Sequence, residues 1–254
     1  MPTVEGAGVP LAVVERGAGP PVLLVHGIAS DAQAMAPIAE ALAGDARVIA
    51  YDRRGYGASG MPEPYQGTTV HEQAEDAAHV LRGLDAAPAV AAGDGLGALV
   101  VLDLLTRHRA LIRAAVIRDP PLFMLVPEAT EALAAERAEI AEAVRAGGPP
   151  AGVQAWLGAR AGGEALERAK AAHRAFFADY AGLASWPASR RGLRALDAPA
   201  VVLTGPGSPP AIVAAADALA ALMPAARRAG DGDLAAAARS LLGSDAASPS
   251  PPGP

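Results

Sequence analysis

The fold is decided by a stretch near the start of the chain, residues 20–60, which reads PPVLLVHGIASDAQAMAPIAEALAGDARVIAYDRRGYGASG. Two short apolar runs in it, Val22–His26 and Arg47–Tyr51, are rich in Val, Leu and Ile, which predicts strands buried on both faces. Between them, Asp31–Ala43 has the apolar spacing of a helix. A strand, a helix and a second strand in this order predict a βαβ unit with parallel strands.

The same alternation continues through much of the chain. It predicts an α/β fold with a doubly wound, mostly parallel sheet flanked by helices, and Leu11–Glu15 is expected to be an edge strand. The other predicted strands are Pro88–Ala92, Ala114–Arg118 and Ala200–Thr204, and the other predicted helices are Val70–Leu84, Leu96–His108 and Ala211–Met223.

The middle of the chain differs, because from Pro120 to about Asp197 the pattern is helical and contains no convincing strand. Thr130–Arg145 and Glu164–Asp179 are the clearest helices there. The end of the chain, SPSPPGP, has the composition of a disordered terminus. The predicted units are therefore a core of residues 1–119 and 198–243, a helical cap of residues 120–197 and a disordered tail of residues 244–254.

Composition limits the partners and the location that we expect. The chain has 254 residues, of which 52% are hydrophobic, enough for a large core. A net charge of −6 argues against a nucleic-acid surface and against a polybasic membrane surface. The lack of cysteine excludes disulfides and thiolate catalysis. No signal peptide and no membrane-spanning apolar run is visible, so we expect a cytoplasmic protein.

Residues 20–60 resemble the first third of α/β-hydrolase-fold enzymes. The resemblance rests on His26–Gly27 after the first strand and on Asp-x-Arg-Gly-x-Gly-x-Ser over residues 52–59 after the second, and it extends over roughly residues 10–242. It implies that the backbone near Ile28 supplies one oxyanion donor and that His26 mainly holds this loop.

The segment Ala91–Ala98, AAGDGLGA, lies where this family has its nucleophile elbow, Gly-x-Ser-x-Gly. Gly93 and Gly97 occupy the flanking glycine positions, and Gly95 occupies the position of the nucleophile. Glycine has no side chain, so covalent catalysis from this position is impossible. Glycine does relieve the strain of the turn. The turn and the N–H groups of the next helix, including that of Leu96, can therefore be retained in a protein that has lost the nucleophile.

The resemblance also implies an acid after the strand Ala200–Thr204 and a histidine after the last strand. The first place reads Gly-Pro-Gly-Ser-Pro, residues 205–209, and the second reads Gly-Asp-Gly-Asp, residues 230–233. The last histidine is His173, inside the predicted cap. The sequence therefore predicts a degenerate catalytic triad and argues against an ordinary serine hydrolase.

Two aspartates are the candidate catalytic residues. In one interpretation Asp94, beside the elbow tip, faces an apolar pocket and serves as a general base. In the other it bonds beneath the turn or at the helix N-terminus. Asp119 ends a strand at the carboxyl edge of the sheet, where ligands bind in open α/β folds. Alternatively, Asp119 and Pro120 only begin the turn into the cap.

Large aromatic side chains are concentrated in the predicted cap, where they form either an apolar lid over a ligand or the core of the cap itself. The predicted oxyanion and pocket residues are His26, Gly27, Ile28, Gly95, Leu96, Phe123, Trp156 and Phe177.

Two functions follow from these patterns. In the first, the protein acts non-covalently on a small apolar carbonyl or ester-like compound, as a hydrolase, lyase or isomerase that keeps the oxyanion donors. In the second, it is a catalytically inactive relative that binds a small molecule or a protein partner. A third interpretation, a relocated triad, needs a serine or aspartate near His26 or His173. No cofactor, metal, nucleic acid or membrane is expected, and the oligomeric state is left open.

Overall fold

The computed structural model describes residues 1–243, so the predicted disordered tail lies outside the described residues. The strands are β1 Thr3–Glu5, β2 Pro10–Arg16, β3 Pro21–Val25, β4 Arg47–Tyr51, β5 Ala89–Asp94, β6 Ile112–Arg118, β7 Ala200–Thr204 and β8 Ala226–Asp231. The α-helices are α1 Ala36–Leu42, α2 Val70–Gly83, α3 Leu96–Arg107, α4 Thr130–Gly147, α5 Pro149–Leu157, α6 Gly163–Ala171, α7 His173–Gly182, α8 Arg190–Arg194, α9 Pro210–Leu222 and α10 Leu234–Leu242.

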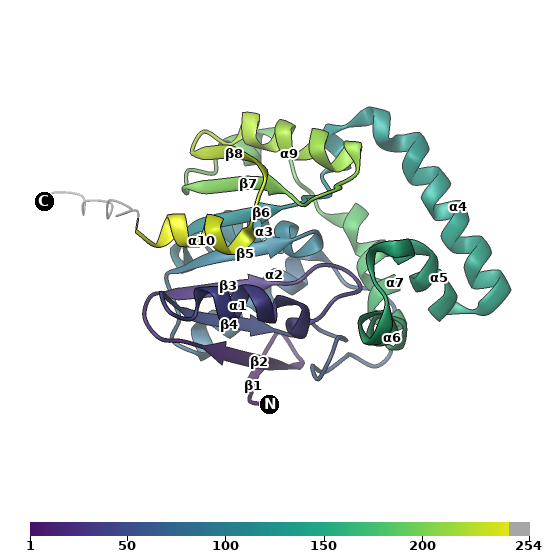
Figure 1. The fold of residues 1–254 in the computed structure, drawn as a ribbon, viewed down its shortest axis with the longest axis horizontal. Helices are drawn as coiled ribbons and strands as arrows, with labels where there is room; N and C mark the ends of the chain where they lie inside the picture. The colour runs from purple at the N-terminus through teal and green to yellow at the C-terminus, as the bar shows by residue number, and fades with distance from the viewer. Residues whose placement is uncertain (244–254) are drawn as a thin grey trace, which may run out of the picture.

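The strands form one sheet in the order β1-β2-β4-β3-β5-β6-β7-β8 (Figure 1). Strands β3 to β8 pair in parallel, whereas β1 and β2 form an antiparallel edge. This arrangement confirms the predicted fold class. Two strands were not predicted: β1 is only three residues long, and β8 contains two arginines and is only partly buried, so neither has the apolar run of a central strand.

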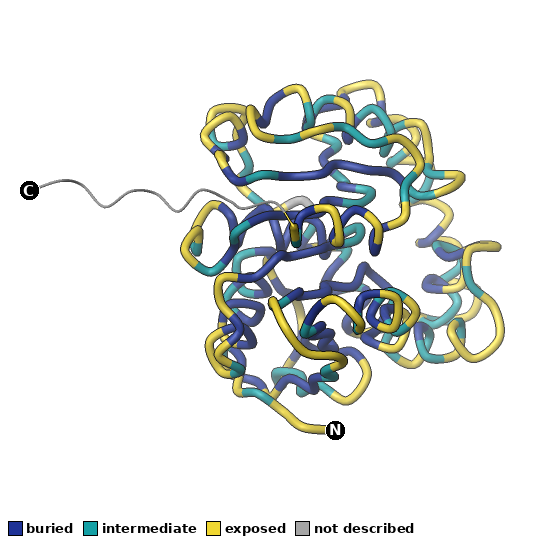
Figure 2. Tube along the Cα trace, turned by 60° about the vertical axis from the view of Figure 1, so that its left-hand side comes forward, coloured by how far each residue is buried: buried dark blue, intermediate teal, exposed yellow. Residues whose placement is uncertain are grey.

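Helices on both faces of the sheet bury its central strands. Along β3, Leu23 and Val25 face a core formed with α2 and α3, while Val22 and Leu24 face a second core formed with α1 and α10. In Figure 1, α1 and α10 lie in front of the sheet, and Figure 2 shows buried segments concentrated in the middle of the molecule. Two buried faces explain why these strands contain continuous apolar runs instead of alternating ones.

Every regular element described between β6 and β7 is helical, and these helices are called the helical insertion below. Loops after β3 and β4 contact it, so it lies over the carboxyl ends of those strands. The helix predicted over Glu164–Asp179 is in fact two helices, α6 and α7, which are separated at Ala172. The boundaries predicted for a helical cap, residues 120–197, remain a prediction. None of the helices in residues 1–243 combines the length and apolar character needed to cross a membrane.

Candidate functional site

The turn between β5 and α3 lies where the sequence predicts a nucleophile elbow, and it has glycine at its tip. Gly95 at the tip has φ 55° and ψ −119°, a conformation that glycine adopts without a Cβ penalty. A Cβ on Gly93 would lie 2.2 Å from the carbonyl oxygen of Gly97, and one on Gly97 would lie 2.2 Å from that of Val25. Near a Cβ on Gly95, the closest atom would be the Cα of Gly27, at 3.8 Å. Close packing therefore requires glycine at both flanks, whereas the tip has room for a side chain that this protein lacks.

The loop after β3 is held by hydrogen bonds to His26 and Arg53. The backbone N–H of Arg53 donates to His26 Nε2 (2.9 Å), so a neutral ring carries its proton on Nδ1, which donates to the carbonyl oxygen of Gly27 (2.9 Å). Burial, with a smaller contribution from the charge of Arg53, lowers the pKa of His26 well below its ordinary value. His26 is therefore a neutral, fully buried structural residue.

This arrangement orients a free backbone donor. Arg53 Nη2 also donates to the carbonyl oxygen of Gly27 (2.8 Å). In a trans peptide the N–H points opposite to the C=O, so the N–H of Ile28 points away from Arg53. Within residues 1–243, neither this N–H nor that of Leu96, the first residue of α3, donates a hydrogen bond to the protein. The structure therefore leaves two unpaired backbone donors, one in the loop after β3 and one at the start of α3, which are the kind of donor that an oxyanion site uses.

A buried network connects this loop to the helical insertion. Arg53 Nη2 donates to Asp179 Oδ2 in α7 (2.7 Å), and the two side chains are 1% and 0% exposed. Asp179 also accepts from the Tyr56 hydroxyl (2.8 Å) and from Gln73 Nε2 (2.7 Å). Burial alone would lower the pKa of Arg53, but the Asp179 carboxylate holds it above the ordinary arginine value. The loops after β3 and β4, α2 and α7 thus share one buried set of hydrogen bonds.

The carboxylate of Asp94 is paired with Arg118. The two residues are register partners on β5 and β6, and the guanidinium bonds the carboxylate through Nε and Nη2, both at 2.8 Å. The hydrogen bond with Asp94 raises the pKa of Arg118. Both side chains are about a quarter exposed, at 25% and 23%. Asp94 therefore faces an arginine at the edge of the site instead of lying alone in an apolar pocket.

Asp119 ties the end of β6 to the loop after β7. Its φ is 49°, and its carboxylate accepts from the Ser208 hydroxyl (2.5 Å) and from the backbone N–H of Gly205 (3.1 Å). These bonds join the end of β6 to the loop in which the resemblance implies an acid. In this arrangement Asp119 stabilises a turn, and its oxygens are already engaged by the protein.

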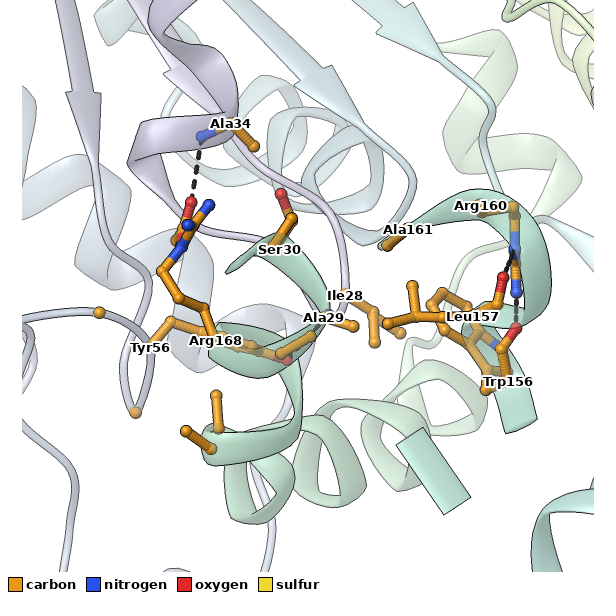
Figure 3. A pocket seen from close by; sticks show the side chains of 17 residues that line it. Ile28, Ala29, Ser30, Ala34, Tyr56, Trp156, Leu157, Arg160, Ala161 and Arg168 are labelled. Atoms are coloured by element: carbon orange, nitrogen blue, oxygen red, sulfur yellow. Dashed lines mark hydrogen bonds and ion pairs between the residues drawn. The ribbon is translucent and has the colours of Figure 1, made fainter. Parts of the chain in front are cut away.

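A cavity of about 700 Å³ lies between the carboxyl-end loops and the helical insertion (Figure 3). Of the predicted oxyanion and pocket residues, Ile28 and Trp156 line it. The others are not among its lining residues: His26, Gly27, Gly95, Leu96, Phe123 and Phe177. Its polar and charged lining residues are Ser30, Asp31, Tyr56, Arg160 and Arg168. Sequence reasoning missed the two arginines, because nothing in the pattern showed which face of the insertion would meet the core.

The aromatic residues of the insertion pack mainly on one another. The Phe176 ring is fully buried, with ring centroids 5.4 Å from Trp156, 5.0 Å from Phe177 and 5.8 Å from Tyr180. This geometry favours the alternative in which these rings form the core of the insertion, with Trp156 alone among them reaching the cavity wall.

The described residues do not support a relocated triad on either histidine considered. His26 bonds only backbone groups, and the bond made by the His173 ring goes to the carbonyl oxygen of Lys170 (3.1 Å). A different pair, His71 and Asp103 (2.8 Å), connects α2 with α3, but none of the serine hydroxyls in the described part of the chain bonds to His71. Within residues 1–243, no group of three or more histidine, aspartate or glutamate side chains is placed to hold a metal ion.

The sheet order, the glycine-rich turn between β5 and α3 and the loop after β3 define a protein with the architecture of an α/β hydrolase, with glycine at the tip of that turn. A family model described as alpha/beta hydrolase fold matches residues 20–197, and the chain belongs to this family.

Curated relatives match the chain over a part of their length. The chain is 35% identical to the uncharacterized hydrolase YraK of Bacillus subtilis, over 48% of this chain and 45% of that protein. It is 33% identical to a 2-(acetamidomethylene)succinate hydrolase of Mesorhizobium japonicum, over 46% of this chain and 41% of that protein. The match therefore spans less than half the length of each of these relatives.

Solved structures match over almost the whole chain. An alpha/beta hydrolase from Sphaerobacter thermophilus superposes with a TM-score of 0.75 at 26% identity and covers 95% of this chain and 98% of its own. A thermophilic esterase from Thermogutta terrifontis, solved with malate bound, has a TM-score of 0.72 at 26% identity, with 94% and 93% covered.

Proposed function

We propose that this protein binds the carbonyl oxygen of a small apolar carbonyl or ester-like compound between the backbone N–H groups of Ile28 and Leu96, and converts the compound without a covalent intermediate. The observation that carries the proposal is the intact elbow with glycine at its tip. The turn and both unpaired donors are present, while the side chain that would attack the substrate is absent.

Such a site can polarise a carbonyl but cannot form an acyl-enzyme. Loss of one oxyanion donor costs serine proteases about 100- to 1000-fold in rate, so retained donors supply real stabilisation of developing negative charge. Chemistry that needs only this stabilisation and a proton carrier includes hydrolysis by water, elimination and isomerisation. Asp94 is the carboxylate adjoining the tip, and its Oδ2 would lie 4.0 Å from a Cβ placed on Gly27. We assign it the proton transfer.

The names of the relatives agree with small-molecule chemistry at a carbonyl group. The matching curated proteins include a 2-(acetamidomethylene)succinate hydrolase and a putative carbamate hydrolase, RutD, of Azorhizobium caulinodans. These names support the class of substrate. They support no individual substrate, since the matched region covers less than half of either protein.

A second candidate, small-molecule binding without catalysis, is favoured by a specific observation. Asp94 is held by two hydrogen bonds from Arg118, and Asp119 by bonds from Ser208 and Gly205. A carboxylate that serves as a base must release such a partner as the substrate binds. If Asp94 stays bound to Arg118, the backbone N–H groups of Ile28 and Leu96 bind a ligand and no reaction follows.

One experiment separates the two candidates. Wild-type protein and the variant Asp94→Asn are assayed on a panel of short p-nitrophenyl esters. The matched control is Asp217→Asn, which removes a carboxylate that pairs with Arg228. The proposal predicts slow turnover of the esters with no burst of p-nitrophenol. The turnover rate should fall at least tenfold in Asp94→Asn and should be unchanged in the control. A stoichiometric burst would overturn the non-covalent mechanism. Ligand binding with no turnover on any ester would support the second candidate.

A further inference from the structure

The cavity under the helical insertion carries an excess positive charge. Three charged residues line it, Asp31, Arg160 and Arg168. Asp31 is already engaged, because Oδ2 pairs with Arg168 Nε (2.6 Å) and Oδ1 accepts from the backbone N–H of Ala34 (3.0 Å). This pairing leaves Arg160 as the uncompensated charge of the lining.

Arg160 is held in place by uncharged groups. Its guanidinium carbon stands 4.3 Å from the centroid of the Trp156 ring, and its Nε donates to the carbonyl oxygen of Leu157 (3.0 Å). Nη2 donates to the carbonyl oxygen of Trp156. None of the ion pairs found in residues 1–243 includes Arg160, and its Nη1 donates to no group in this part of the chain. The guanidinium is thus oriented but not neutralised.

The surroundings of Arg160 are consistent with a guanidinium that would be stabilised by a bound anion. Arg160 is an exposed residue, but the part of its side chain that packs against the protein loses water without gaining a carboxylate partner, and this partial desolvation lowers its pKa. Glu136 opposes this effect from a greater distance, and its own Oε1 accepts a hydrogen bond from the Tyr180 hydroxyl (2.8 Å). An oriented guanidinium offers a planar fork that matches a carboxylate.

We infer that Arg160 is a carboxylate-binding residue, and that the cavity takes a small aliphatic compound with a carboxylate at the Arg160 end and its carbonyl group towards Ile28. Apart from the charged residues, Ser30 and Tyr56, the lining is mainly alanine and glycine with Ile28, Leu157 and Trp156, which suits a short apolar chain between the two ends. Figure 3 shows Ile28 between Arg160 and Arg168 in the view. The carbonyl end of this ligand rests on the proposed function, whereas the carboxylate end stands on Arg160 alone.

Isothermal titration calorimetry with paired probes tests the inference. The anionic probes are the monomethyl esters of succinate, glutarate and adipate, and the neutral probes are the corresponding dimethyl esters. The variants are Arg160→Gln, the charge-conserving Arg160→Lys, and Arg145→Gln as a matched control. Arg145 lies on α4, is 71% exposed and pairs only with Glu142, so its substitution removes the same charge outside the cavity.

We expect at least one monoester to bind the wild-type protein and the Arg145→Gln control equally, and to bind Arg160→Gln roughly tenfold more weakly. Arg160→Lys should fall between them, since it keeps the charge but loses the fork. Added salt should weaken monoester binding to the wild type more than to Arg160→Gln. Neutral diesters should not distinguish Arg160→Gln from the wild type.

Failure of this inference can be told from failure of the proposed function. If no monoester binds the wild type, or if Arg160→Gln binds monoesters as tightly as the wild type, Arg160 does not bind carboxylate. Ester turnover that depends on Asp94 but not on Arg160 would keep the proposed function and overturn the inference. Arg160-dependent binding without turnover of any ester would keep the inference and leave the protein as a binder.

Discussion

Replacing Asp179 by Asn should loosen the helical insertion from the core. Asp179 Oδ2 accepts from both Arg53 and the Tyr56 hydroxyl, and Oδ1 accepts from Gln73. An asparagine amide supplies only one oxygen, so its NH₂ group must face at least one of these donors. The substitution also leaves the buried Arg53 charge without its counterion, since Arg53 and Asp179 are 1% and 0% exposed.

The expected loss is large because both partners are buried. Removing one partner of a buried ion pair typically costs about 3–5 kcal/mol. That is a sizeable share of the total, because the free energy of unfolding of a domain is about 5–15 kcal/mol. For a chain of this size each kcal/mol lowers the midpoint by about 2–4 °C, so the melting midpoint should fall by roughly 6–20 °C.

A second ion pair between the same two parts of the molecule provides the control. Arg174, also in α7, pairs with Glu63 in the loop after β4 at 2.9 Å, and the two side chains are 42% and 67% exposed. Glu63→Gln removes this pair where water screens it, so the midpoint should stay close to that of the wild type. Urea and thermal unfolding, followed by circular dichroism, measure both variants. Equal midpoints for Asp179→Asn and Glu63→Gln would refute the reasoning.

The remaining predictions concern the elbow and His26. Gly93→Ala should destabilise the protein by about 3 kcal/mol or prevent folding, since its Cβ would lie 2.2 Å from a carbonyl oxygen, whereas Gly95→Ala should cost about 1 kcal/mol for its positive φ. Equal unfolding midpoints in urea would contradict this difference. Burial lowers the pKa of His26 in the folded state, so below its unfolded value of about 6.5 the unfolded chain binds one more proton. The free energy of unfolding should therefore fall by up to about 1.4 kcal/mol per pH unit as the pH drops from 6.5 towards 5.5. The control His173→Gln should show the same dependence of the free energy of unfolding on pH as the wild type. A wild-type free energy of unfolding that does not change between about pH 6.5 and 5.5 would contradict the role assigned to His26.

Much of the fold could be predicted from the sequence because its central strands are buried on both faces. Such strands produce apolar runs, as in Val22–Val25 and Ala200–Thr204, and these are visible without any tertiary information. The edge strand β8 escaped prediction because Arg227 and Arg228 lie on a half-exposed surface, where burial imposes no pattern. The break between α6 and α7 escaped because helical spacing continues across Ala172.

For the site, prediction depended on whether a residue acts through its backbone or its side chain. The lack of a side chain at Gly95 could be stated from the sequence, because it does not depend on the fold. The partner of Asp94 could not, although Arg118 directly precedes Asp119, because pairing across β5 and β6 depends on strand register. Arg160 was missed because a surface arginine and a cavity arginine look identical in a helical pattern.

The sequence by itself determined the order of the central strands and of most helices between them, the membership suggested by residues 20–60, and the glycine at position 95. Only the tertiary structure decided which charges are neutralised. Arg53 and Asp179 are 126 residues apart in the chain, yet they form one buried pair, while Arg160 has no carboxylate partner among residues 1–243. The physical reason is that periodicity reports which face of an element is buried, whereas the partner of a charge depends on how separate elements dock.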